Sequence, residues 1–293
     1  AEHFGVPLVS TIHATEAGRH SGWVSGRVNR QVHSIEWWLA HESDAVITCS
    51  AAMHDEVETL FAPFPASSHV IRNGIDVRTW SYSARPPRSG APSLLFVGRL
   101  EYEKGVQDLI AALPRVRRTH PGTTLTVVGD GTQRQWLVDL ARTHRVRRAV
   151  TFVGSLSHDG VLAHLRRADA LVLPSRYEPF GIVALEGAAA GTPLVTSTAG
   201  GLGEAVVDGV TGMSFPVGDV AALAVDRAAF QHALDVVRLA LRLQVGHHAV
   251  DFLVADEGAV HADRQAGAAG HVEHVAHAQQ RLGAHLVQDG AAV

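Results

Sequence analysis

The sequence predicts an α/β protein whose larger part is a doubly wound parallel sheet. From Ser93 onward, short apolar strands alternate with helical stretches at regular spacing, which is the pattern of successive βαβ units. These strands are apolar throughout, as strands covered on both faces should be. The chain has 293 residues, of which 46% are hydrophobic and 18% charged, enough apolar material for cores in two domains.

The second series of elements covers residues 93–222 and is predicted to form one such domain. Its strands are apolar and alternate with helical stretches, and the first of these, GVQDLIAALPRVRRTH, is amphipathic. Strands are expected at 93–100, 124–131, 149–154, 170–175 and 192–197, with helices at 105–120, 133–144, 158–168 and 181–191.

Residues 1–80 show a shorter series of the same kind and are predicted to be part of another Rossmann-like domain. The stretch 81–92, rich in Pro, Ser and Gly, is typical of a linker between domains. Strands are expected at 7–15, 44–50 and 68–74, and the turn pair Asn73-Gly74 closes the last of them. Helices are expected at 29–41 and 51–61, and Ser50 is the expected cap of the second. One face of the first helix carries Val32, Ile35, Trp38 and Leu39.

The tail, residues 223–293, differs in composition. It is rich in alanine and histidine and has no lysine or proline, and a helical pattern is plausible only over Asp226–Leu243. The segment HVEHVAH offers His271, Glu273 and His274 as metal ligands. The alternative, which the composition favours, is a poorly packed segment of unusual composition with no metal.

Charge and cysteine content exclude several classes of function. A formal net charge of −4 gives no electrostatic basis for binding nucleic acid. The sequence has no apolar run long enough for a transmembrane helix, although contact with a membrane surface stays open. The single cysteine, Cys49, excludes an intrachain disulfide and is consistent with a reducing cytoplasm.

Two cations follow the first strand of the second series. In the segment GRLEYEKG, Arg99 and Lys104 share one loop, and Lys104 is the only lysine of the chain. Ligands of doubly wound sheets bind at the carboxyl ends of the strands. An arginine fork beside a mobile ammonium suits a diphosphate, whereas the alternative is a pair of solvated surface cations.

Two carboxylates follow the strand at 170–175, in the segment SRYEPFGIVALEG. Glu178 lies in the loop and Glu186 in the helix, so both can face one cleft and hold hydroxyl groups. Backbone N–H groups near Phe180 and Gly181, at the helix start, can face an anion. An acidic residue at a helix start is also ordinary, but a carboxylate on an apolar helix requires a partner.

Glycine-rich loops follow two other strands of the same series. Gly200 and Gly201 follow the strand at 192–197, and the segment Gly129–Gly131 closes the strand expected at 124–131. Each loop either lets the backbone approach a ligand or only permits a turn. Their shared position at one edge of the sheet favours a binding role, because the carboxyl ends of parallel strands converge there.

Taken in order, GRL-x-x-E-K-G, the Gly-Asp-Gly loop and PSRYEPFGIVALEGAAAGTPLVTSTAGGLGEAVVDGVTG resemble the donor domain of glycosyltransferase family 4, over about residues 94–220. Upstream, VSTIHATEAGR, SIEWWLAHESDAVITCS and VIRNGID resemble the second half of that family's acceptor domain. The segment HATEAGRH and the Glu-Trp-Trp helix are similar to the bacterial, glycogen-synthase-like α-glucan branch of the family. The resemblance implies the two-domain GT-B fold, with residues 93–222 as the nucleotide-sugar donor domain.

The resemblance also implies transfer of a hexose, expected to be glucose, from a nucleoside diphosphate to a sugar or glucan acceptor, with retained configuration and no metal or other cofactor. It implies that Arg99 and Lys104 hold the diphosphate, helped by Phe180 and Gly181. The remaining roles that it implies are a ribose contact for Glu186, catalytic contacts with the transferred sugar for His13 and Glu178, and sugar or acceptor contacts for Glu16, Arg19, Gly200 and Gly201.

The sequence departs from the family pattern at both ends. The family's acceptor domain opens with a glycine-rich strand-loop-helix, and about a hundred residues are expected to be missing before Ala1. Beyond about Ala222 we expect a shifted reading frame or an unrelated fusion. A noncatalytic nucleotide-sugar-binding fragment is therefore the alternative function. A Rossmann-type dehydrogenase is disfavoured, since the loop after residues 93–97 lacks G-x-G-x-x-G.

Overall fold

A computed structural model describes residues 2–63, 67–82 and 90–223 of the chain. Most of the predicted linker lies outside these ranges, as does nearly all of the tail. The helix predicted over Asp226–Leu243 and the metal hypothesis on His271, Glu273 and His274 therefore lie outside the described residues.

The first described part contains a small sheet of three parallel strands in the order β1-β2-β3. Each strand pairs in register with the next one along the chain, as βαβ units require. Ser50 caps the third helix as predicted, because its hydroxyl accepts the Met53 N–H. The elements are β1 (Val9–Ile12), α1 (Glu16–Arg19), α2 (Gly26–Glu42), β2 (Ala45–Thr48), α3 (Ala51–Phe61) and β3 (Ser67–Val70).

Helix α2 does not bury the apolar face expected from its sequence. Ile35 and Trp38 are 64% and 60% exposed, and Val32 is exposed as well. The helix instead turns Glu36 inward, where its carboxylate accepts the Glu16 N–H at the start of α1. This N–H at the start of α1 has no acceptor within its own helix, and the Glu36 side of α2 supplies one.

The second described part is a sheet of six parallel strands in the order β6-β5-β4-β7-β8-β9. The doubly wound parallel sheet predicted from the sequence is confirmed. The strand order reverses between β4 and β7, which makes this boundary the topological switch point of the sheet. The strands are β4 (Ser93–Val97), β5 (Thr124–Val128), β6 (Val150–Gly154), β7 (Ala170–Leu173), β8 (Leu194–Ser197) and β9 (Met213–Phe215).

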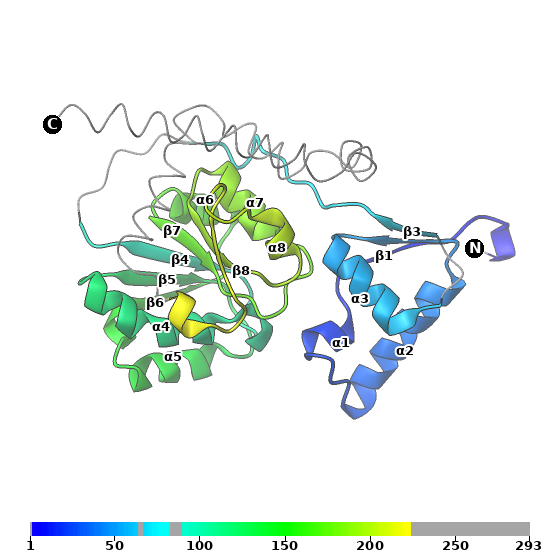
Figure 1. The fold of residues 1–293 in the computed structure, drawn as a ribbon, viewed down its shortest axis with the longest axis horizontal. Helices are drawn as coiled ribbons and strands as arrows, with labels where there is room; N and C mark the ends of the chain where they lie inside the picture. Colours follow the sequence, from blue (N-terminus) through cyan, green and yellow to red (C-terminus); the bar gives the residue numbers. More distant parts are fainter. Residues whose placement is uncertain (1, 64–66, 83–89, 224–293) are drawn as a thin grey trace. The chain divides into compact units, whose positions relative to one another are not determined.

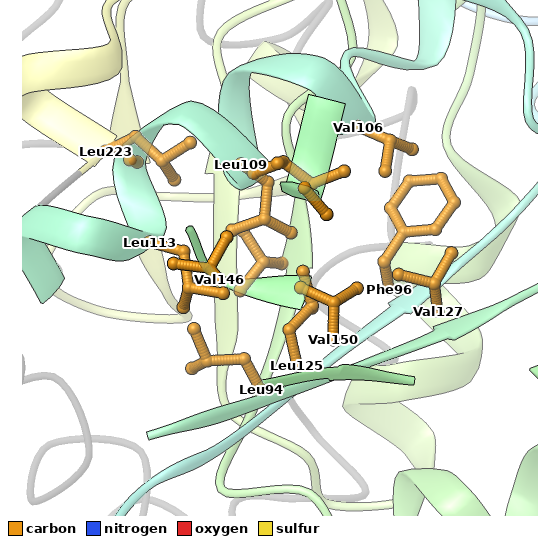
Figure 2. Packing of buried hydrophobic residues seen from close by; sticks show 14 of the residues in the cluster. Leu94, Phe96, Val106, Leu109, Leu113, Leu125, Val127, Val146, Val150 and Leu223 are labelled. Carbon is orange, nitrogen blue, oxygen red and sulfur yellow. The ribbon is translucent and has the colours of Figure 1, made fainter. Parts of the chain in front are cut away.

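Helices cover both faces of this sheet (Figure 1). Successive residues of β4 point to opposite faces, so Leu94 and Phe96 join one core cluster and Leu95 the other. Figure 2 shows the first cluster, in which Leu109 and Leu113 of α4 pack on the strands. The helices are α4 (Val106–Thr119), α5 (Arg134–Thr143) and α9 (Val220–Leu223) on this face, and α6 (His158–Leu165), α7 (Ile182–Ala189) and α8 (Gly201–Ala205) on the other.

Two core contacts join residues far apart in the sequence. Trp80 packs in the cluster under α6 and α7, with its ring against His158. Phe180 and Leu185 belong to the cluster that contains Ile12 of β1 and the buried residues of α3. The small three-stranded sheet therefore completes its core with side chains from the loop and helix that follow β7.

Within the described ranges, no helix is long and apolar enough to cross a lipid bilayer.

Candidate active site

A cavity of about 450 Å³ lies where strands β4 and β7 end. Adjacent parallel strands present their carboxyl ends at the same edge of a sheet, and a ligand crevice is expected where the strand order reverses. Gly98 and Arg99 reach the cavity from the loop after β4, and Glu178 from the loop after β7. The predicted site residues that line it are His13, Arg19, Arg99, Lys104, Glu178, Phe180 and Gly181.

Lys104 and Glu178 form an ion pair inside this cavity. The ammonium nitrogen lies 2.9 Å from Oε2 of the carboxylate, and the two side chains are only 17% and 16% exposed. The Ser175 hydroxyl donates to the same carboxylate oxygen at 3.1 Å. The structure thus brings together two residues that are 74 positions apart and that the sequence assigned to different parts of the donor.

Arg99 lies at the rim of the cavity. Its side chain is 59% exposed, and its guanidinium donates to the Glu103 carboxylate at 2.9 Å. The main chain of Glu103 faces the other way, because its carbonyl oxygen accepts the N–H groups of Arg176 and Tyr177. One residue therefore fixes both the candidate phosphate ligand and the loop after β7.

A second ion pair ties the two cavity loops together. Nε and Nη2 of Arg176 each lie 2.8 Å from an oxygen of the buried Asp108 carboxylate, in the first turn of α4. Hydrogen bonding to Asp108 holds the pKa of the Arg176 guanidinium above its ordinary value. A planar fork that meets both carboxylate oxygens restricts orientation as well as distance, so the loop after β7 is held on α4.

Gly105 permits this close approach of the two loops. It has φ of 69°, and a methyl group added there would overlap the carbonyl oxygen of Pro174. Gly181, with φ of 98°, ends the other loop as the N-cap of α7, where an added methyl would meet Leu202. The first N–H groups of α7 have no intrahelical acceptor, and Ile182 and Val183 line the cavity.

Glu186 lies on α7, outside the set of residues that line the cavity. Burial raises its pKa to about 7, against a smaller opposing effect of His158. Its carboxylate has no hydrogen-bond partner among the described residues. A half-buried carboxyl group without a partner remains available to hydroxyl groups of a ligand.

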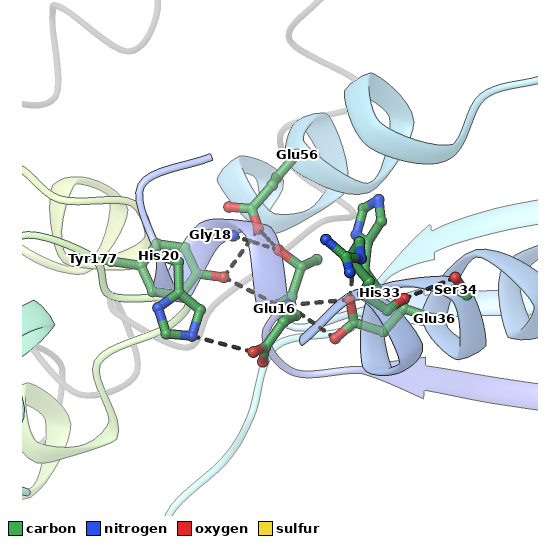
Figure 3. A network of polar contacts seen from close by, with 10 residues as sticks. Glu16, Gly18, His20, His33, Ser34, Glu36, Glu56 and Tyr177 are labelled. Carbon is green, nitrogen blue, oxygen red and sulfur yellow. Dashed lines mark hydrogen bonds and ion pairs between the residues drawn. The ribbon is translucent and has the colours of Figure 1, made fainter. Parts of the chain in front are cut away.

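On the side of the small sheet, His13 and Arg19 line the cavity but Glu16 does not. The Glu16 carboxylate accepts a contact from the His20 ring at 3.1 Å (Figure 3). That pairing turns it toward α1 and away from the cavity wall. The Cys49 thiol also lines the cavity, and burial raises its pKa to about 11, which keeps it neutral at ordinary pH.

Gly200 and Gly201 pack against the loop that carries Glu178. The Gly201 N–H donates to the Glu178 carbonyl oxygen at 2.9 Å. A methyl group at Gly200 would overlap that same carbonyl, and one at Gly201 would overlap Phe180. Neither glycine lines the cavity, so in this structure both shape the loop from behind. Gly129 does the same for the loop after β4, since a methyl group there would overlap Gly98.

A polar network extends from the Glu178 loop to the small sheet (Figure 3). The Tyr177 hydroxyl donates to the Glu56 carboxylate at 3.0 Å and accepts the Thr15 N–H at 3.2 Å. The Thr15 hydroxyl donates to the same Glu56 carboxylate and caps α1 at Gly18. Burial raises the pKa of the Tyr177 hydroxyl well above its ordinary value, so it remains a hydrogen-bond donor.

Sequence reasoning missed several residues of the site. Asn73 lines the cavity, although its pairing with glycine indicated only a turn. Ser175 and Tyr177 flank Glu178 at the cavity wall, and their place directly after an apolar strand was the available signal. Nothing in the sequence linked Arg176 to Asp108, because that pairing depends on how α4 packs beside β7.

No group of three or more side chains suited to a metal ion occurs in the part of the chain that the structure describes. The cationic groups at the cavity are those of Lys104, Arg99 and Arg19. The arrangement can therefore neutralise an anionic group at the ends of β4 and β7, with carboxylates beside it for hydroxyl groups. A doubly wound sheet with a ligand crevice at its switch point is typical of the class of nucleotide-binding proteins.

Comparison with known proteins places the chain within that class. The family model "Glycosyl transferases group 1" matches residues 82–229, and "Glycosyltransferase Family 4" matches residues 1–79. The chain belongs to the group 1 glycosyl transferases and, as predicted, to the family 4 enzymes of the GT-B fold.

Relatives and solved structures agree with this assignment. Glycogen synthase of Mycobacterium tuberculosis is 66% identical over 235 residues, 80% of this chain and 56% of the relative. A glycosyltransferase of Methanocaldococcus jannaschii is 39% identical over 219 residues, 71% of this chain and 56% of that protein. The chain thus spans little more than half the length of these curated relatives.

Two solved structures share the fold. Sucrose-phosphate synthase from Thermosynechococcus elongatus superposes with a TM-score of 0.67 at 25% identity, over 87% of this chain and 70% of that one. Anabaena HepE in complex with UDP and glucose gives a TM-score of 0.68 at 23% identity, over 85% of this chain and 69% of that one. These superpositions confirm the GT-B fold predicted from the sequence.

Proposed function

We propose that this chain carries the donor site of a hexosyltransferase that moves glucose from a nucleoside diphosphate to a sugar or glucan acceptor, with retained configuration. The observation that carries the proposal is the placement of Lys104 and Glu178 together at the switch point between β4 and β7. A cation for the diphosphate and a carboxylate for sugar hydroxyls are both required there. The name of the mycobacterial relative, glycogen synthase, supports glucose and a glucan.

Each site residue has a role in this proposal. As the bond from the sugar to the diphosphate breaks, negative charge grows on the leaving group, and Arg99 and Lys104 stabilise it. Their charges take the place of a metal ion, so the proposed reaction uses no metal or other cofactor. Glu178 accepts sugar hydroxyl groups and Glu186 accepts those of the ribose. His13, which lines the same cavity, contacts the transferred sugar.

The remaining assignments concern the acceptor side and the cell. Arg19 lines the cavity as His13 does and is proposed to contact the acceptor or donor sugar, with Glu16 as a less direct candidate. The buried free thiol of Cys49, the only cysteine, supports a reducing cytoplasm. The alternative function is a fragment that binds nucleotide sugar without transferring it.

Binding and transfer measurements on this chain test the proposal. ADP-glucose or UDP-glucose should bind and NAD should not, and labelled glucose should appear in a glucan acceptor if the chain is catalytic. Arg99→Ala and Lys104→Ala should each weaken donor binding or transfer by about 2 kcal/mol, the usual strength of a charged hydrogen bond. Arg142→Ala, at an exposed ion pair on α5, is the matched control. Binding of NAD alone would refute the proposed function, and binding without transfer would favour the alternative.

A further inference from the structure

The ion pair between Lys104 and Glu178 occupies the place where the proposed donor needs both groups separately. The ammonium contacts the carboxylate at 2.9 Å, and both side chains are largely buried. A diphosphate needs the ammonium, and sugar hydroxyl groups need the carboxylate. Neither is fully available while the two are paired, so the pair has to open when a donor binds.

The loops that carry these side chains are held together without them. The N–H groups of Arg176 and Tyr177 bind the Glu103 carbonyl oxygen, at 2.7 and 3.2 Å. The Arg176 guanidinium binds Asp108 in a two-pronged contact. The Lys104–Glu178 pair can therefore open by rotation of two side chains while both loop backbones stay in place.

The carboxylate also keeps a second partner when the ammonium leaves. The Ser175 hydroxyl donates to it at 3.1 Å, and that hydroxyl lies on the short segment between β7 and Glu178. An ionised carboxylate without any partner in a largely buried place would be costly. The remaining hydrogen bond lowers that cost, and sugar hydroxyl groups can supply the others.

We propose that Glu178 is an internal competitor for Lys104: it holds the ammonium in the empty site, yields it to the donor diphosphate, and then binds the sugar. This inference rests on the proposed function. A nucleotide sugar satisfies both released groups. A nucleoside diphosphate without the sugar binds only Lys104. The Glu178 carboxylate then lies without a sugar partner beside the negative charge of the diphosphate. The site therefore favours the loaded donor, and return of Glu178 to Lys104 helps to expel the nucleotide product.

Glu178→Gln should strengthen the binding of phosphate ligands, although it removes a charge from the candidate site. Removal of the carboxylate charge that competes with phosphate for Lys104 should tighten binding of inorganic pyrophosphate, UDP and ADP. The expected gain in affinity is about three- to tenfold, the size expected when one charge near the ligand is neutralised. The same variant should lose most of the extra affinity that glucose adds to UDP-glucose or ADP-glucose. Asp139→Asn, the same chemical change in an exposed ion pair on α5, should alter neither. Isothermal titration calorimetry on the full chain measures all of these affinities.

Lys104 offers a direct spectroscopic probe, because it is the only lysine of the chain. Protein labelled with ¹³C-lysine gives one lysine side-chain spin system, and Lys104→Met identifies it by its disappearance. The signal should shift when pyrophosphate is added to the original protein, and at lower pyrophosphate concentration in Glu178→Gln. The free forms of these two proteins should also differ at this signal, since one has the ion pair and the other does not.

The outcomes separate this inference from the proposed function. Tighter pyrophosphate binding by Glu178→Gln without any nucleotide-sugar binding would support the exchange and refute the function. Nucleotide-sugar binding with unchanged or weaker pyrophosphate binding in the variant would refute the exchange and leave the function. A Lys104 signal that pyrophosphate never moves would overturn the exchange in either case.

Discussion

The two described parts of the chain differ in how completely they bury their apolar side chains. The six-stranded part has a core on each face of its sheet. The three-stranded part has one core cluster, which includes Phe180 and Leu185 from the other part. Twelve of the seventeen exposed large hydrophobic side chains in the described ranges lie between residues 4 and 82. The six-stranded part is therefore the one whose stability is largely its own.

The two parts also contribute different residues to the candidate site. The proposed diphosphate and sugar contacts come from loops of the six-stranded sheet, which has complete layers on both sides. His13 and Arg19 come from the part with the smaller core. Donor binding should therefore depend mainly on the six-stranded part, and transfer should depend on how firmly the other part is held against it.

Gly105→Ala should have the largest effect on stability, about 4 kcal/mol or more of unfolding free energy. The residue has positive φ, and its added methyl group would overlap the Pro174 carbonyl, which cannot move without breaking the β7 loop. Gly22→Ala in the three-stranded part is the matched control. That residue also has positive φ, but an added methyl group would meet nothing within 4 Å, so only the cost of about 1 kcal/mol for the backbone is expected. Urea unfolding measures both, and equal losses would contradict the packing argument.

Core truncation should give the next largest contrast. Leu113→Ala removes a fully buried side chain from the cluster in Figure 2 and should cost about 3 kcal/mol. Ile35→Ala removes a side chain that is 64% exposed on α2 and should change the unfolding free energy by less than about 0.5 kcal/mol. Chemical denaturation compares the two. A large loss for Ile35→Ala would mean that α2 buries the face predicted from its sequence.

Tyr177→Phe should weaken the contact between the two parts by about 1 kcal/mol, the usual net value of a hydrogen bond. The change removes the hydroxyl that bonds to Glu56 and Thr15 and leaves the ring in place. We expect the three-stranded part to unfold at lower urea concentration than the six-stranded part, so that one transition becomes two. Tyr82→Phe, at an exposed tyrosine, is the control. A single unshifted transition would show that the network does not join the parts.

The protonation of Glu186 should make both the stability of the protein and its donor binding depend on pH. Burial raises its pKa from 4.5 to about 7, so the folded protein binds more protons than the unfolded chain between these values. The unfolding free energy should therefore fall as the pH rises through this window. Nucleotide-sugar affinity should rise between about pH 6 and pH 8, because the carboxylate is the better acceptor for ribose hydroxyls. The diphosphate diester does not titrate there. Glu186→Gln should flatten both profiles, and persistence of either slope would assign it to another group.

Much of the fold follows from local sequence. Apolar strands such as 93–97 and 170–173 are recognisable because both faces are buried, which removes the polar alternation of a surface strand. Ser50 as a helix cap was also predictable, since its hydroxyl acts on an N–H three residues away. The candidate residues Arg99, Lys104 and Glu178 were found because ligand loops follow strand ends.

The remaining features depend on contacts between distant segments, which only the tertiary structure decides. That β4 lies beside β7 brings Lys104 to Glu178 and Arg176 to Asp108, although no local pattern encodes either pair. The inward side of α2 carries Glu36, which accepts the Glu16 N–H, and the buried Ala40, and it is not the apolar face expected from the spacing of the helix. The sequence by itself determined which segments form strands and helices and which residue types could bind a donor. The packing of the sheet determined which of those residues meet, because hydrogen bonds and close ion pairs form only between groups that lie within a few ångströms in space, however far apart they are along the chain.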